Sequence, residues 1–286
     1  MSEEILSSDK RAMNPTLQRY LSALITPKGI FAVLMISAIT LIAVLAPVIF
    51  PQGYDEQTRN SLSAASWEHP FGTDEIGRDL LVRSVYGLRT DLGLIFSAVP
   101  LSMAIGTILG LLGIVSNRLG HWVQRALDII AGFPGLILGI CIVIVVGTGW
   151  FALFLAITVA GLPAFGRLAR ATLLTQMNRE YVVAATTLGV SKWKIMLRHI
   201  LPNAAETIIA QGAVFVVAAV FIEAALSIVG LGLQPPDPSL GMLLNIGMLY
   251  VTISPFYVVG PTLILILLAL AFSLLADALN EAVNKR

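Results

Sequence analysis

The sequence predicts an all-α polytopic membrane protein with six transmembrane helices. The 286-residue chain is 57% hydrophobic and only 12% charged, whereas soluble domains are about 45–50% apolar and about 25% charged. Its apolar residues fall in long charge-free runs, and a helix that crosses a membrane needs about 20 such residues. Lysines and arginines gather between alternate runs, which indicates a fixed orientation in the membrane.

The charge-free runs locate the spans in chain order. They are Ile30–Phe50, Leu92–Val115, two spans within 129–166, Thr207–Leu231 and Tyr257–Ala276. A turn at Gly147-Thr148-Gly149 separates the two spans within 129–166. Glycines and polar residues dilute the stretch 239–254. We therefore interpret that stretch as an interfacial or re-entrant helix outside the membrane core.

These spans predict the organisation of the chain. The predicted parts are a cytoplasmic N-terminal segment (1–28), a first span (29–50), an extracytoplasmic loop (51–91), a five-helix domain (92–278) with a cytoplasmic loop (171–203), and a cytoplasmic tail (279–286). Of the 18 lysines and arginines, all except Arg59, Arg78, Arg83 and Arg89 lie on the side of the two termini. The loop 51–91 is instead rich in acids: Asp55, Glu56, Glu68, Asp74, Glu75, Asp79 and Asp91. Both termini are therefore predicted to be cytoplasmic.

The cytoplasmic loop has the pattern of two short helices joined at a glycine. The run 181–188 favours a helix, and Gly189 fits a left-handed C-cap. A second helix is predicted over 192–200, ended by Pro202. Such a unit is a compact knob that projects from the membrane, although an ordinary amphipathic loop has a similar local pattern.

This loop resembles the "EAA" loop of permease subunits of binding-protein-dependent ABC importers, which docks on a cytoplasmic ATPase. The matching residues are Ala184, Ala185, Gly189, Leu201 and Pro202. By this resemblance Glu180 and Tyr181, at the start of the loop, belong to the same docking segment. Val183 and His199 depart from the pattern, because the family usually has Glu and Ile there. No contact of that Glu carries over to this chain.

Three further segments indicate which kind of importer permease the chain resembles. His69–Asp79, Asp128–Pro134 and Glu223–Gly241 look like hallmark segments of the C-type permease of dipeptide, oligopeptide and nickel ABC importers. They occur in the family's order, and the resemblance extends over nearly all the chain from Gly29 onward. It implies a type I ABC importer permease fold with a MetI-like core, in which this chain forms half of a pathway for peptides. Nickel chelates and glutathione are the alternative substrates.

The resemblance also implies partners and a location. A second homologous permease, two ABC ATPase subunits and an extracytoplasmic solute-binding protein are expected to assemble with this chain among the membrane lipids. ATP and Mg²⁺ are expected on the ATPase subunits, with no cofactor on this chain. The expected location is the inner (plasma) membrane of the cell.

The segment after the first span suggests tight turns. Its residues are Gly72, Thr73, Asp74, Gly77, Arg78 and Asp79. We expect the carboxylates to cap nearby helix N-termini or to pair with Arg78 and Arg83. Contact with a delivery protein is the alternative.

Two acids fall inside predicted spans, where a carboxylate is costly and by default faces the bundle interior. Asp128 lies near the cytoplasmic end of its span, where it either pairs with Arg125 or Arg118 or faces the pathway. For Glu223, capping, a subunit contact and a pore-lining role all remain open. Phe133-Pro134 lies early in the third span, where proline kinks a helix and creates a gate or a packing notch.

The sequence offers no catalytic or metal site. It has no Gly-x-x-x-x-Gly-Lys-Ser/Thr phosphate loop and no Gly-x-Ser-x-Gly motif. Its three histidines are scattered, and Cys141 is its only cysteine. A net charge of +1 argues against a nucleic-acid partner. A secondary transporter, the alternative from another class, would need its own substrate site and often internal repeats. A membrane-embedded enzyme would need a nucleophile or a metal site.

Overall fold

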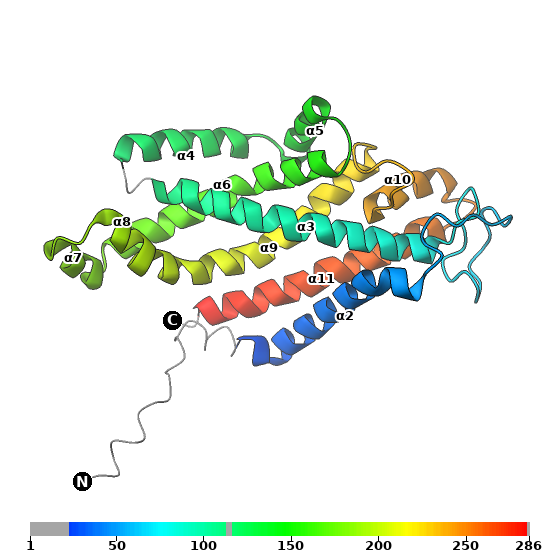
Figure 1. Cartoon of the computed structure of the whole chain (residues 1–286), viewed down its shortest axis with the longest axis horizontal. Coiled ribbons are helices and arrows are strands. Elements are labelled where there is room, and N and C mark those ends of the chain that lie inside the picture. Colours follow the sequence, from blue (N-terminus) through cyan, green and yellow to red (C-terminus); the bar gives the residue numbers. More distant parts are fainter. Residues whose placement is uncertain (1–22, 113–115, 285–286) are drawn as a thin grey trace, which may run out of the picture.

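Helices form nearly all of the regular structure in the computed structural model, which describes residues 23–112 and 116–284 (Figure 1). In chain order they are α2 (Pro27–Ile49), α3 (Leu80–Leu111), α4 (Asn117–Gly132), α5 (Gly135–Val146), α6 (Trp150–Met177), α7 (Glu180–Thr187), α8 (Lys192–Ile195), the π-helix η2 (Met196–Ile200), α9 (Leu201–Ile228), α10 (Leu240–Tyr250) and α11 (Phe256–Asn284). The described residues contain no strand, only an isolated bridge between Thr73 and Asp79.

Five helices are long and apolar enough to cross a membrane, and a bent pair completes the set. The five are α2, α3, α6, α9 and α11, and the pair is α4 with α5. The all-α polytopic fold is therefore confirmed, with six spans if the bent pair counts as one. The stretch 239–254 contains the 11-residue helix α10, which is too short to span a membrane.

The kink predicted at Phe133-Pro134 is a complete break. The helices on either side, α4 and α5, meet at 97°. Phe133 has extended backbone angles (φ −83°, ψ 137°). A proline disfavours the helical conformation of the residue before it, so the chain leaves the helix at Phe133 and starts a new one at Gly135.

Helix α3 begins well before the predicted start of its span at Leu92. Its first turn follows Asp79, so Arg83 and Asp91 are helical and buried rather than in an exposed loop. Charge-free runs place a span too late when its first turns carry charges that pair inside the protein.

Small residues allow the central helices α3 and α6 to pack closely. A Cβ at Gly110 would lie 2.3 Å from the carbonyl oxygen of Gly166, and a Cβ at Gly106 would lie 2.8 Å from Cβ of Phe165. Close helix approach at small residues is the usual packing mode in membranes. Helix α2 lies outside this core, against α11 and α3 (Figure 1).

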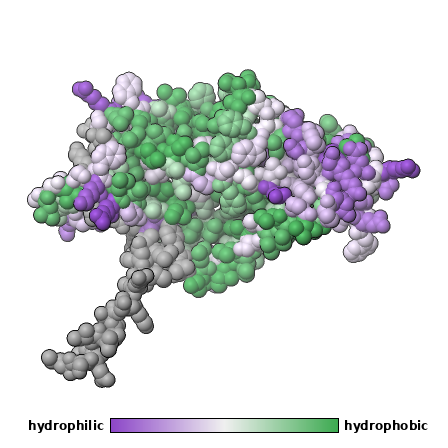
Figure 2. Space-filling view, viewed as in Figure 1, coloured by the Kyte–Doolittle hydropathy of each residue, from purple (hydrophilic) through white to green (hydrophobic). Residues whose placement is uncertain are grey.

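The surface separates into an apolar middle and two polar ends (Figure 2). We refer to the end with the 50–79 segment as the loop end, and to the opposite one, with α7 and α8, as the knob end (Figure 1). Large apolar side chains such as Leu34 and Val48 of α2 are exposed on the middle, as expected of a surface that faces lipid. Of the basic residues used to predict orientation, Lys10, Arg11, Arg19, Lys285 and Arg286 lie outside the described residues.

Candidate functional site

A knob made of α7, α8 and η2 (residues 180–200) projects beyond the spans (Figure 1). It connects the end of α6 to the start of α9. Glu180 is the first residue of α7, and the Tyr181 hydroxyl donates a 2.7 Å hydrogen bond to Oε1 of Gln176, near the end of α6. This bond ties the knob to the preceding span.

The turn at Gly189 closes α7 as predicted. Gly189 has φ +74°, and its N–H donates to the carbonyl of Thr186 at 3.0 Å. The N–H of Val190 donates to the carbonyl of Ala185 at 3.1 Å. This pair of bonds is a Schellman motif, which satisfies the last carbonyls of a helix and fixes the direction of the chain. The two halves of the knob are therefore joined rigidly.

Pro202 does not end a helix, contrary to the prediction. It occupies the first turn of α9, directly after η2. The turn before it is the π-helix Met196–Ile200, a wider turn of the kind found as local bulges within helices. As a result α8, η2 and α9 follow one another without a loop, and Leu201 begins the transmembrane helix itself.

The knob has a buried anchor and several exposed apolar side chains among its polar ones. Val182, Ile195 and Ile200 are buried in the main core. Ala185 is half-buried beside them, whereas Ala184 and Pro202 are exposed. The apolar exposed side chains include Val183, Trp193 and Leu188, which is 82% exposed. The resemblance did not point to Leu188. Its signal in the sequence is an apolar residue directly before the turn glycine.

Asp128 on α4 pairs with Arg167 on α6. Nη2 of Arg167 lies 2.9 Å from Oδ1 of Asp128, and both side chains are about half exposed. The amide of Gln124 also donates to Asp128, while Arg125 contacts His121 instead. The partner expected from sequence, Arg125 or Arg118, is therefore wrong, because the nearest cation comes from another helix.

Glu223 lies in a buried polar cluster where α3, α9 and α10 meet. The Ser227 hydroxyl donates to Oε1 of Glu223 at 2.7 Å, and the Ser239 side chain also hydrogen-bonds Glu223. Asp91 accepts the backbone N–H of Leu240 at 3.1 Å and lies close enough to Glu223 to interact electrostatically. We name Asp91 and Glu223 the acid pair. It faces the N-terminus of α10, where negative charge is favourable.

Close packing holds α10 against the acid pair. A Cβ at Gly241 would lie 2.6 Å from Cβ of Ser227 and 3.2 Å from Oε2 of Glu223. Ser239 caps α10 by accepting the N–H of Met242 at 3.0 Å. Glu223 thus serves as an internal support for α10 in this chain. Asp91 was missed because its position in sequence suggested a loop acid.

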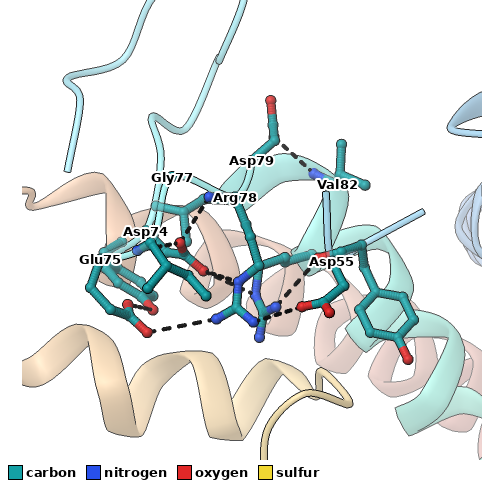
Figure 3. A network of polar contacts seen from close by, with 12 residues as sticks. Asp55, Asp74, Glu75, Gly77, Arg78, Asp79 and Val82 are labelled. Carbon is teal, nitrogen blue, oxygen red and sulfur yellow. Dashed lines mark hydrogen bonds and ion pairs between the residues drawn. The ribbon is translucent and has the colours of Figure 1, made fainter. Parts of the chain in front are cut away.

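At the loop end, ion pairs organise the segment before α3 (Figure 3). Arg78 donates to Oδ2 of Asp74 at 2.6 Å and to Oδ1 of Asp55 at 2.9 Å. Nε of the fully buried Arg83 lies 3.6 Å from Oδ2 of Asp74. Burial lowers the pKa of Arg78, but its hydrogen bonds to Asp74 and Asp55 outweigh that effect and hold the pKa above its usual value. The guanidinium therefore remains charged.

Asp79 caps α3, which confirms the predicted capping role of this segment. Its Oδ1 accepts the N–H groups of Leu81 and Val82 at 2.8 and 3.0 Å. Its other oxygen, Oδ2, contacts Nδ1 of His69 at 2.6 Å. The Thr73 hydroxyl hydrogen-bonds the carbonyl of Asn60. These contacts make the segment a folded cap over the bundle.

Two turns of the cap require glycine. Gly72 and Gly77 have φ +77° and +81°, and a Cβ on either would lie 2.3 Å or less from a backbone oxygen, that of Ser63 or Thr58. Their role in this structure is to let the chain fold back closely on itself. Among the described residues, no group of three or more His, Cys, Asp or Glu side chains is placed to hold a metal ion.

Residues 102–286 match the family of binding-protein-dependent transport system inner membrane components. A dipeptide transport system permease of Alkalihalophilus pseudofirmus is 34% identical over 263 residues, 90% of this chain and 86% of the relative. A di/tripeptide permease of Pseudomonas aeruginosa is 36% identical over 85% of this chain and 83% of its own length.

A further relative and a solved structure are also similar to this chain. A glutathione transport system permease of Pectobacterium atrosepticum is 32% identical over 90% of this chain and 85% of its own length. Among solved structures, a chain of the inward-facing MetNI methionine ABC transporter matches with a TM-score of 0.53 and 21% identity. That match covers 70% of this chain and 96% of the other. At this identity it supports the fold alone.

Proposed function

Because this chain belongs to the family of binding-protein-dependent transport system inner membrane components, we propose that it forms half of the translocation pathway of an ABC importer for di- and oligopeptides. The observation that carries the proposal is the similarity to dipeptide and di/tripeptide permeases, which extends over 85–90% of the chain. Glutathione is a second candidate substrate, supported by the relative from Pectobacterium.

A permease of this kind works with ATPase and binding-protein partners. We propose the arrangement implied by the sequence: a second, homologous permease, two ATPase subunits that carry ATP and Mg²⁺, and one solute-binding protein. The knob end then faces the cytoplasm with both termini, and the loop end faces outward. In a bacterium the proposed location is the inner membrane.

The knob is the proposed seat for an ATPase subunit. The knob lies beyond the spans (Figure 1). Val183 and Leu188 are among its exposed apolar side chains, and exposed apolar groups of this kind are available for protein contacts. The Schellman turn at Gly189 makes the knob rigid. A rigid seat is what force transmission requires.

Helix α9 supplies a direct mechanical path through the membrane. It follows η2 without a loop at the knob end and carries Glu223 near the loop end. There Glu223 supports α10 through Ser239. We propose that movement of the knob upon ATP-driven closure of the ATPases tilts α9 and moves α10 with it. The pathway would then alternate between inward-open and outward-open states.

Affinity purification of the tagged chain in mild detergent tests this proposal. We expect mass spectrometry to identify a second permease and ATPase subunits, and the reconstituted complex to import a dipeptide only with ATP and a binding protein. A chain that purifies alone and still transports when reconstituted would instead be a secondary transporter.

A further inference from the structure

A cavity of about 410 Å³ opens at the loop end of the bundle. Its wall comes from four separate parts of the chain: the segment after α2, helix α3, the start of α6, and the connection between α9 and α10. This volume lies within the range of about 300–1,000 Å³ that is usual for small-molecule sites. The cavity is separate from the buried ion pairs of Figure 3 and from the acid pair.

Aromatic rings form one part of the wall. The rings of Tyr54 and Tyr86 are 5.1 Å apart, and the Tyr86 hydroxyl is anchored to the carbonyl of Phe50 at 3.2 Å. Trp150 also lines the cavity and stacks on Phe154 at 5.4 Å. Because each ring is held by a neighbour, the apolar surface is already in place for a ligand.

Two opposite charges complete the wall. Arg89 and Asp237 are the charged residues that line the cavity. The Tyr54 hydroxyl donates to Oδ1 of Asp237 at 2.7 Å, and this bond raises the pKa of Tyr54, so the phenol stays protonated. In the part of the chain that the structure describes, no ion pair is formed by Arg89 or Asp237.

Arg89 differs in this respect from Arg78 and Arg83, the two buried arginines of the same region. Arg78 and Arg83 are buried against Asp74, whereas Arg89 is exposed at the cavity. A guanidinium presents paired N–H donors that match a carboxylate. Arg89 therefore offers a carboxylate site that the protein itself leaves open.

We infer that this cavity binds a short peptide in its zwitterionic form, with the terminal carboxylate at Arg89 and the terminal ammonium at Asp237. The peptide side chains would contact Tyr54, Tyr86 and Trp150. Recognition of the two termini together with non-specific aromatic contacts accepts many sequences. The inference rests on the proposed function, since it assigns a peptide site to the outward face of an importer permease.

The test is calorimetric titration of the purified importer complex, without its binding protein, with three probes. The probes are L-leucyl-L-leucine, its C-terminal amide and its N-acetyl derivative. We expect the free dipeptide to bind more tightly than either blocked form. Arg89→Gln should weaken binding of the free dipeptide roughly tenfold or more, the usual effect of losing a charge-assisted hydrogen bond. It should also abolish the preference for the free dipeptide over its C-terminal amide.

Asp237→Asn provides the complementary measurement. It should abolish the preference for the free over the acetylated amino terminus and leave the acid-over-amide preference intact. Arg59→Gln is the matched control, because Arg59 is exposed at the same end but does not line the cavity. A merely structural role for either residue would weaken all three probes alike.

Three results would overturn the inference: no saturable binding of the free dipeptide to the wild-type complex, equal binding of the amide, or equal effects of Arg89→Gln and Arg59→Gln. ATP-dependent uptake by the same wild-type preparation, with binding protein added, separates this inference from the proposed function. Uptake without binding at the cavity rejects the site alone. Absence of peptide uptake rejects the proposed function.

Discussion

Asp128 of α4 and Arg167 of α6 form a 2.9 Å ion pair, which joins the helix before the 97° break to the central span. Arg167 lies ten residues before the end of α6 at Met177, or about 15 Å along the helix. The pair is about half exposed, so this chain alone does not enclose it. Arg170 adds a second link from α6 to α4, since it donates to the carbonyl of Gly120 at 2.9 Å.

Asp128→Asn should change the stability of the protein only slightly. An exposed ion pair contributes little to stability, so the thermal unfolding of the purified complex should barely shift. ATP-driven peptide uptake should fall, because α4 loses its charged link to α6. The exchange Asp128→Arg with Arg167→Asp should restore uptake if the link is what matters. Failure of the exchange variant, with Asp128→Asn fully active, would contradict this role.

Gly189→Leu should uncouple ATP hydrolysis from uptake while the protein still inserts into the membrane. A Cβ at Gly189 meets no atom within 4 Å, so the cost arises from the backbone conformation at φ +74°. For a non-glycine residue that cost is about 1–2 kcal/mol. Gly189→Asn is the matched control, because Asn tolerates this conformation better. The measurement is the amount of peptide taken up per ATP hydrolysed in proteoliposomes. A wild-type value of this ratio for the Leu variant would contradict the docking role.

Asp74→Ala should destabilise the loop end severely. Asp74 is fully buried and engages Arg78 at 2.6 Å and Arg83 at 3.6 Å. Removing one partner of a buried ion pair costs about 3–5 kcal/mol, because the other charge remains buried. Asp55→Asn is the control. Its side chain is 53% exposed, so the loss should stay below about 1 kcal/mol. Similar melting temperatures for both variants would argue against the network as the support of this end.

Glu223→Leu should loosen α10, whereas Glu223→Gln should be mild. Leucine leaves the hydroxyls of Ser227 and Ser239 without their shared acceptor, at a cost of about 1–3 kcal/mol each if they stay buried and unpaired. Glutamine keeps an acceptor oxygen. Hydrogen exchange over residues 240–250 is the measurement. Unchanged protection in the Leu variant would mean that α10 is held by its apolar contacts alone.

The sequence was sufficient to predict those structural features that depend on residues close together in the chain. The cap at Gly189 depends on one residue with a left-handed conformation, and the cap at Asp79 depends on its position before an apolar helix. The break at Phe133-Pro134 follows from the extended conformation that a proline favours for the residue before it. Long apolar runs predicted α2, α3, α6, α9 and α11 for the same reason, because each of these runs is long enough to cross the membrane. The run 129–146 instead contains the break and the 12-residue helix α5.

The remaining features depend on contacts between distant segments. Asp91 faces Glu223 across a large separation in sequence, and the partner of Asp128 comes from another helix. Arg89 and Asp237 share a cavity only after α3 and the α9–α10 connection meet. The positions of charges along the chain do not predict which distant residues meet in the fold. They also placed the start of α3 too late, since a buried, paired charge looks like a loop residue.

Cross-linking at Leu188 tests the central claim, that the knob seats an ATPase. Leu188→Cys is introduced after Cys141→Ser removes the chain's single cysteine, with Ser61→Cys at the loop end as control. A short reagent that links a thiol to a nearby lysine amine is added to the assembled complex. We expect a product containing the permease and an ATPase subunit from the Leu188 position and none from Ser61. A complex that transports with ATP but gives no ATPase product from Leu188 or its neighbour Val183 would contradict it.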